Sequence, residues 1–195
     1  MTRYKIIVSK WLILLLISGL SFDCQGQTSY KCYIKNIHAM SAKVIQFDVW
    51  IESTGGSNLR LQGFQGGINI NNFKSFANGG HVTGSFLAGS ADKHLPPKQQ
   101  APNWSFDTVS QQIHMFAEIL ISNSAATVIP SADGKGIKIG TCQLTNTTDF
   151  NGLPDLSWIF GSRGTARTNT VILCYVNNDI KGTDVTNAAY HSVMK

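Results

Sequence analysis

Hydrophobic and polar residues alternate with a period of two through much of the chain. Between positions 43 and 52, Ile45, Phe47, Val49 and Ile51 alternate with polar or amphipathic residues. Successive side chains of a β-strand point to opposite faces, so this pattern predicts a strand with one buried face. Residues 113–119 repeat the pattern and predict a second strand of the same kind.

Shorter patterns predict the remaining strands. They lie at residues 31–37, 59–71, 103–107, 136–145, 156–160 and 170–176. Clusters of Gly, Asn, Asp and Pro separate these segments and are typical of turns. No segment after position 26 has a helical stripe of adequate length, so the pattern predicts an all-β sandwich in a single domain.

Two segments depart from simple alternation. Residues 76–102 are rich in Gly, Ser, Ala and Pro and are expected to form a long connection. Gly140 interrupts the strand at 136–145, so Ile139 and Cys142 share a face only if one extra residue bulges out there. A bulged strand suits a curved sandwich.

The first 26 residues read as a secretory signal peptide. A basic start is followed by an apolar run at 11–20 and a small-residue exit that ends at Gly26. Cleavage there leaves residues 27–195 as one domain that works outside the cytoplasm, either secreted, at the cell surface or in the periplasm. The alternatives are a retained membrane anchor, for which the run is short, and a lipid-modified Cys24.

Composition argues against nucleic-acid binding. Charged residues make up 14% of the chain, against roughly 25% in an average soluble protein. The formal net charge is +5, and it falls to +3 without the predicted leader. No cluster of Lys and Arg appears, so the sequence lacks the basic patch of a nucleic-acid-binding surface.

Three cysteines follow the leader: Cys32, Cys142 and Cys174. In an oxidising compartment an odd number allows at most one internal bridge. One interpretation is that all three are small apolar core residues on different strands. The alternative is a disulfide between Cys142 and Cys174.

The sequence carries no catalytic signature, and we expect no enzyme. Glu52 and Glu118 are the only glutamates, and each is expected on the outward face of a strand rather than in a pair across a cleft. A Gly-x-Ser-x-Gly motif is absent. The five histidines are scattered without ligand spacing.

No cofactor is expected, and calcium is the alternative considered. The richest oxygen clusters contain Asp149 and Asp155 in one segment and Asp179 and Asp184 in another. Neither has the alternating spacing of an EF-hand loop. Turn formation explains both clusters, because Asn and Asp side chains close turns themselves.

Sugar binding requires exposed aromatic rings beside amide or hydroxyl groups. Trp50 shares the polar strand face with Gln46, and Trp104 stands between Asn and Ser. His114 and Phe116 form a further row on the outer face of their strand. These five residues are the candidate ligand-binding set, with packing under neighbouring loops as the alternative for each ring.

Glycine-containing strand patterns at residues 61–69 and 136–146 resemble those of cohesin-like and carbohydrate-binding-module-like domains of secreted bacterial proteins. The resemblance implies a two-sheet jelly-roll sandwich of about nine strands and a non-catalytic role. Its main functional implication is polysaccharide binding. The alternative is a structural or adhesion module of the cell surface that docks a partner protein.

Overall fold

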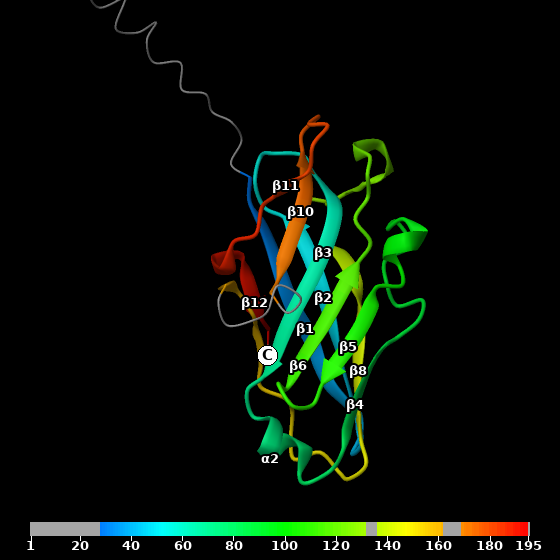
Figure 1. Ribbon diagram of the computed structural model, residues 1–195, viewed down its shortest axis with the longest axis vertical. Coiled ribbons are helices and arrows are strands. Elements are labelled where there is room, and N and C mark those ends of the chain that lie inside the picture. The colour runs from blue at the N-terminus through cyan, green and yellow to red at the C-terminus, as the bar shows by residue number, and fades with distance from the viewer. Residues whose placement is uncertain (1–27, 132–135, 162–168, 195) are drawn as a thin grey trace, which may run out of the picture.

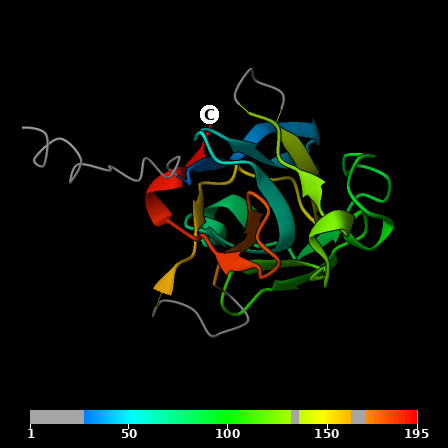
Figure 2. The ribbon, with the colours of Figure 1, turned by 90° about the horizontal axis from the view of Figure 1, so that it is seen from above.

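The computed structural model describes residues 28–131, 136–161 and 169–194. In this part of the chain, two β-sheets pack face to face (Figure 1). Figure 2, which looks along the long axis, shows the two layers end-on. The predicted leader lies outside the described residues.

Sheet A has five strands in the order β12, β1, β2, β8 and β4. Their bounds are β1 (Tyr30–Ser41), β2 (Val44–Ser53), β4 (Val82–Phe86), β8 (Ile137–Asn146) and β12 (His191–Val193). Neighbouring strands are antiparallel except β12, which runs parallel to β1. The C-terminal strand therefore pairs with the first strand of the domain.

Sheet B has seven strands, and its main path runs β11, β10, β3, β6 and β5. The long central strand β3 also pairs with β7 and β9. The bounds are β3 (Leu59–Ile70), β5 (Asn103–Asp107), β6 (Gln112–Ala117), β7 (Thr127–Val128), β9 (Leu156–Trp158), β10 (Val171–Val176) and β11 (Thr183–Asp184).

Helical structure in the described residues is limited to short pieces in connections. The α-helix α2 (Phe73–Ala77) follows β3, and it ends at Asn78 in the left-handed conformation with φ of 48°. Three single turns of 3-10 helix are η1 (Pro97–Gln99), η2 (Asn123–Ala125) and η4 (Ala188–Tyr190). The all-β prediction is therefore confirmed.

Every strand predicted from the pattern is present, with ends that differ by a few residues. The expectation that 76–102 is only a connection is wrong, because Val82–Phe86 forms β4 at the edge of sheet A. The described residues contain twelve strand segments rather than about nine. The excess comes from segments such as β7 and β11, which have two residues each.

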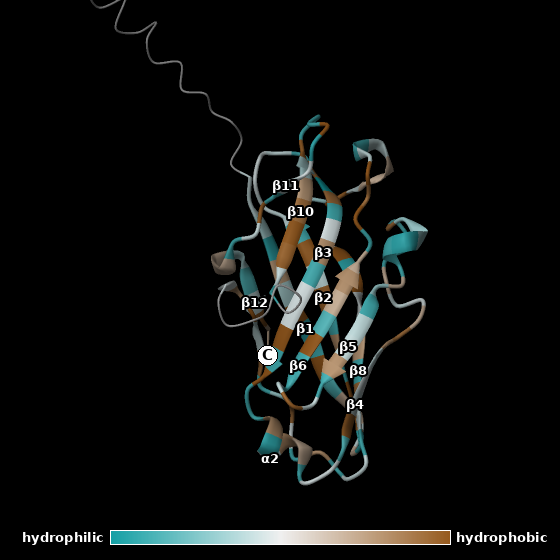
Figure 3. Cartoon of the chain, in the orientation of Figure 1, coloured by the Kyte–Doolittle hydropathy of each residue, from teal (hydrophilic) through white to brown (hydrophobic). Residues whose placement is uncertain are grey.

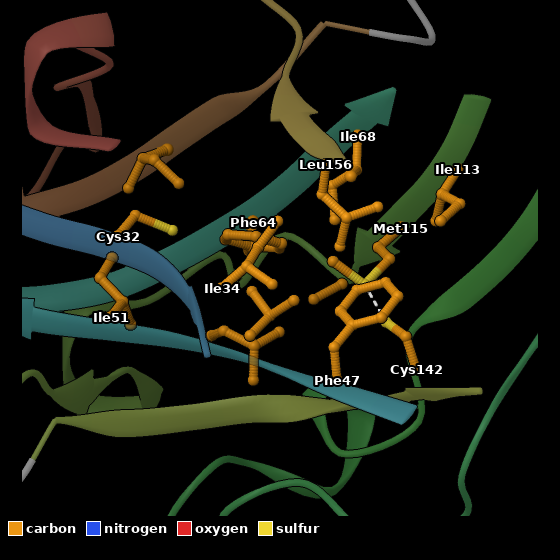
Figure 4. Packing of buried hydrophobic residues seen from close by; sticks show 14 of the residues in the cluster. Cys32, Ile34, Phe47, Ile51, Phe64, Ile68, Ile113, Met115, Cys142 and Leu156 are labelled. Carbon is orange, nitrogen blue, oxygen red and sulfur yellow. Dashed lines mark hydrogen bonds between the residues drawn. The ribbon is translucent and has the colours of Figure 1, made fainter. Parts of the chain in front are cut away.

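The alternating apolar rows form the core between the sheets. Ile45, Phe47, Val49 and Ile51 are all buried on β2. Figure 4 shows Phe47 beside Met115 of β6 and Cys142 of β8. The alternating bands of hydrophobic and hydrophilic colour along the strands in Figure 3 reflect the same pattern.

The bulge expected at Gly140 is confirmed. Val49 pairs with Gly140 and Trp50 pairs with Lys138, so Ile139 is the extra residue on β8. The missing side chain of Gly140 also leaves room for the Phe86 ring, which a Cβ atom at this position would overlap. The glycine is thus required by the close approach of the Phe86 ring as well as by the bulge.

Candidate functional site

Trp50 lies on the outer face of sheet A, as the pattern predicts, but its ring is not open. Lys35 of β1 places its Nζ 3.8 Å from the centroid of the Trp50 ring. Tyr33, the partner of Trp50 on β1, lies beside the same lysine, whose Nζ is 5.3 Å from the Tyr33 centroid. An ammonium over the ring is a favourable contact, and it occupies the face on which a sugar would stack.

Asp48 forms the centre of a polar network on this face. Its carboxylate accepts hydrogen bonds from Lys138 Nζ at 2.8 Å, Thr141 Oγ1 at 2.6 Å and Asn36 Nδ2 at 2.8 Å. Burial alone would raise the pKa of Asp48, but these hydrogen bonds favour the charged form and hold the pKa below its ordinary value. The network ties β1, β2 and β8 together.

The remaining polar residues of the face also contact each other. Gln46 donates from Nε2 to Gln143 Oε1 at 2.8 Å. Glu52 was expected to face solvent, and this is wrong, since only 8% of the residue is exposed. It accepts a 3.2 Å hydrogen bond from the Tyr33 hydroxyl. Burial and the neighbouring Glu52 carboxylate raise the pKa of Tyr33 to about 12.

Trp104 points to the interior rather than to solvent. On edge strand β5 it pairs with Met115, a fully buried residue, so both side chains lie on the inner face of sheet B. A Cβ atom at Gly84 of β4 would lie 3.0 Å from Trp104 Cζ2, so the indole packs against β4 across the two layers. Trp50 and Trp104 therefore belong to different sheets and do not form one platform.

The structure places His114 and Phe116 on the outer face of sheet B, as predicted. Ile113, Met115 and Ala117 are buried on the inner face. His114 is half-buried and its Nδ1 has no hydrogen-bond partner among the described residues. Burial lowers the pKa of His114, and the carboxylate of Asp107 partly opposes the shift.

Ile119 was expected to continue the buried row, and this is wrong. The strand ends at Ala117, so the alternation no longer applies beyond it. The residue is 44% exposed and turns to the outer face. There it contacts Gly63, where a Cβ atom would lie 3.1 Å from Ile119 Cγ1.

Four apolar side chains therefore gather on the outer face of sheet B. We call Phe116, Ile119, Val171 and Leu173 the sheet B patch. Phe116 is 39% exposed, and Val171 and Leu173 of β10 are half-buried. The four surround a shallow hollow of about 110 Å³ whose floor includes Gly63. A second apolar hollow, of about 220 Å³, lies where Ile37 of β1 and Val193 of β12 meet residues 153–156.

Two exposed isoleucines that were not predicted from the sequence lie in neighbouring loops. Ile121 is 97% exposed and Ile180 is 87% exposed. Their loops are joined by a hydrogen bond of 2.8 Å from Asn123 Nδ2 to the carbonyl of Asp179. An isolated isoleucine among Asn, Asp, Lys and Gly residues, as at position 180, is the signal that could have revealed it.

The base of the first loop is fixed to sheet B. The Tyr175 hydroxyl donates to the carbonyl of Leu120 at 2.9 Å, and Arg60 donates to the carbonyl of Ala126 at 3.1 Å. The position of the exposed isoleucines is therefore set by the fold. They lie in loops attached to β3 and β10. Of these strands, β10 carries Val171 and Leu173 of the sheet B patch, and β3 carries Gly63 in its floor.

The alternative of a disulfide between Cys142 and Cys174 is wrong. Cys32, Cys142 and Cys174 are free and buried, on β1, β8 and β10 respectively. The thiol of Cys142 lies 3.4 Å from Met115 Sδ (Figure 4). Cys142 and Cys174 lie on different sheets, and burial raises the pKa of both thiols.

The candidate calcium ligands are spread over different turns. Asp155 accepts a hydrogen bond from Asn71, and Asp184 accepts hydrogen bonds from the amide and hydroxyl of Thr186. Asp149 and Asp179 use their backbone carbonyls to accept from Asn78 and Asn123. In the described ranges, no three His, Cys, Asp or Glu residues come together as a metal site.

Comparison with known proteins gives a likeness in structure only. No family model and no curated protein matches the sequence. The second type II cohesin module of an adaptor scaffoldin from Acetivibrio cellulolyticus superposes with a TM-score of 0.50 at 8% identity, over 86% of this chain and 87% of that chain. A type II cohesin from a cohesin–X–dockerin complex of the same organism has a TM-score of 0.48 at 9% identity, over 85% and 95%.

The chain thus has a cohesin-like β-sandwich fold. This confirms the cohesin part of the resemblance, and the carbohydrate-binding part stays a prediction. Within the ranges that the structure describes, no helix has the length and apolar character needed to cross a membrane.

Proposed function

We propose that this chain is a non-catalytic module that works outside the cytoplasm and binds another protein through the outer face of sheet B. The observation that carries the proposal is the sheet B patch, an exposed apolar cluster over the neighbouring strands β10, β3 and β6. Exposed apolar clusters of this kind mark interaction sites more often than chance exposure does. Phe116 supplies the aromatic side chain that anchors many protein interfaces.

The contrast between the two outer faces supports this choice. On sheet A, Asp48, Glu52 and Gln46 already have hydrogen-bond partners within the chain. Covering that face would separate few apolar atoms from water. On sheet B, the patch and the nearby tips at Ile121 and Ile180 would lose contact with water on binding, and this is the main favourable term in association.

A polysaccharide is the less favoured ligand. Stacking a sugar on Trp50 would require the Lys35 ammonium to move from the ring, and Trp104 packs against Gly84 in the interior. A structurally similar cohesin module, with a TM-score of 0.50, is part of an adaptor scaffoldin, and this supports a protein as the partner. Whether a glycan binds is tested by a glycan array with residues 28–195.

The docking proposal is tested with immobilised domain and secreted or surface proteins of the source organism. A partner retained by the wild type should be lost with Phe116→Asp and Leu173→Asp, with an affinity at least about tenfold weaker. Gln46→Ala, on the outer face of sheet A, is the matched control and should bind as the wild type does.

Two results would overturn the proposal. One is a partner that binds Phe116→Asp and Leu173→Asp with unchanged affinity but fails to bind Gln46→Ala. The other is retention on a glycan that Trp50→Ala abolishes while the melting temperature stays the same. Each variant is first checked by circular dichroism, so that unfolding is not mistaken for lost binding.

A further inference from the structure

The main paths of the two sheets end at four strands, β11, β12, β4 and β5, and these differ in length. On one side of the sandwich, β11 has two residues and β12 has three. At the other end of the two sheets, β4 and β5 have five residues each. Figure 1 shows β4 and β5 at the same side of the molecule, and the two strands pack against each other. Very short edges resist pairing with other chains, whereas longer ones do not.

The free sides of β4 and β5 carry unpaired backbone groups. Each strand pairs on one side only, β4 with β8 and β5 with β6. Among the described residues, the backbone groups of positions 82–86 and 103–107 have no backbone hydrogen-bond partner outside those two ladders. Neither strand contains Pro, Lys or Arg, and the only charge, Asp107, stands at the end of β5. The usual devices that protect an edge are therefore missing.

We propose that a second copy of this chain occupies this edge, with β5 antiparallel to β5 of the second copy and β4 antiparallel to β4 of the second copy. A dimer with two-fold symmetry places the same residue of both copies on the axis. The pairing extends sheet A and sheet B at once.

The sequence of β5 is complementary to itself about Ser105. In that register Trp104 lies opposite Phe106 of the second copy, and aromatic cross-strand pairs are favourable. Asn103 lies opposite Asp107 of the second copy, so an amide meets a carboxylate and no like charges face each other. Ser105 lies opposite Ser105 of the second copy, on the axis.

The sequence of β4 has the same property about Gly84. Val82 lies opposite Phe86 of the second copy on the inner face, and Thr83 lies opposite Ser85 of the second copy on the outer face. Cross-strand apolar pairs and hydroxyl pairs both stabilise antiparallel sheets. Gly84 on the axis adds no side chain that would hold the two backbones apart.

One axis can serve both strands, because their centres lie over each other. A Cβ atom at Gly84 would be 3.0 Å from Trp104 Cζ2 and 3.2 Å from Phe106 Cβ, so Gly84 faces the stretch centred on Ser105. Between the two strands lies a groove of about 410 Å³. A single foreign peptide would satisfy one of the two edges, whereas a second copy satisfies both.

The first test is the oligomeric state of residues 28–195, measured by sedimentation equilibrium up to about 100 µM, since dimer formation depends on concentration. We expect a dimer. Ser105→Lys places two ammonium groups opposite each other at the axis, and should weaken the dimer at least about tenfold. Ser105 is exposed, so the monomer should keep its melting temperature. Thr183→Lys on β11 is the matched control and should dimerise normally.

A cysteine variant tests the register. Residues opposite each other in an antiparallel pair have Cα atoms about 4.5–5.5 Å apart, within the range that a disulfide spans. Ser105→Cys should therefore form a covalent dimer under oxidation. Asn103→Cys should not, because four residues at about 3.3 Å each separate the two copies of position 103. The three native thiols are buried and should contribute little background.

Three results would overturn the proposal. They are a wild type that stays monomeric over the whole concentration range, a dimer that Ser105→Lys does not weaken, and a failure of Ser105→Cys to cross-link where a dimer exists. None of these measurements uses the sheet B patch, so their failure would leave the docking proposal untouched.

Discussion

His191 should make the domain lose stability as the pH falls from about 6.5 towards 4. The residue begins β12, and its Nδ1 donates to the carbonyl of Asn187 at 2.9 Å. Its ring contacts the edges or faces of Tyr30, Trp158 and Phe160, with centroid distances of 5.5, 5.1 and 4.7 Å. Burial among these rings lowers the pKa of His191 to about 4, although the bond to Asn187 opposes the shift.

The sign and size of the effect follow from this pKa. An unfolded histidine has a pKa of about 6.5, so between pH 6.5 and 4 the unfolded chain binds a proton that the folded chain does not. The stabilisation is therefore complete above pH 6.5 and is lost as the pH falls. A difference of about 2.5 pKa units corresponds to at most about 3 kcal/mol in the free energy of unfolding. Partial access of solvent to the ring reduces this to about 2 kcal/mol at pH 4.5.

Urea denaturation at pH 7 and pH 4.5, compared with His191→Phe, measures the effect. The variant keeps a ring in place but loses the bond to Asn187, which should cost about 1 kcal/mol at either pH. Between pH 7 and pH 4.5, the free energy of unfolding of the variant should fall by about 2 kcal/mol less than that of the wild type. Other groups that titrate in this window, such as His114, are present in both proteins and cancel. Equal acid sensitivity in the two proteins would refute the reasoning, and His81→Phe, at an exposed site, should behave as the wild type does.

Four substitutions test the packing. Gly140→Ala should lower stability by about 1–3 kcal/mol because the new methyl group overlaps the Phe86 ring, and an unchanged melting temperature would contradict this. Asp48→Asn should lower the free energy of unfolding by about 1–3 kcal/mol because it leaves the charge of Lys138 without compensation. Equal urea midpoints for the variant and the wild type would contradict this. Met115→Ala should cost about 2–5 kcal/mol and Phe116→Ala less than half as much, since only Met115 is fully buried; equal losses would place Phe116 in the core.

Much of the fold could be predicted from local patterns, because burying one face of a strand forces apolar residues to alternate. The row from Ile45 to Ile51 and the bulge at Gly140 show this. The edge strand β4 was not predicted, since it is short and Gly84 at its centre is a poor strand residue. Its strand conformation depends on pairing with β8, which lies far away in the sequence.

The candidate site was less predictable, because side-chain contacts across strands decide it. The pattern correctly put Trp50 on an outer face, but only the pairing of β1 with β2 brings Lys35 over its ring. Hydropathy assigns isoleucines to the interior, so Ile121 could not be recognised as exposed before its loop was placed. At Ile180 only the polar neighbours in the sequence indicate exposure. The burial of Glu52 likewise depends on Tyr33 from the neighbouring strand.

The two proposals concern different parts of sheet B, and together they have a consequence. The edge strand β5 is directly beside β6, and Asn103 pairs with Phe116. If β5 strands of two copies pair, sheet B becomes continuous across the dimer, and both copies turn Phe116 to the same side of that sheet. A dimer would then present two docking surfaces together, and a partner with two binding segments would be held by avidity rather than by one contact. Such a partner should bind the wild type more tightly than Ser105→Lys, although position 105 lies outside the sheet B patch.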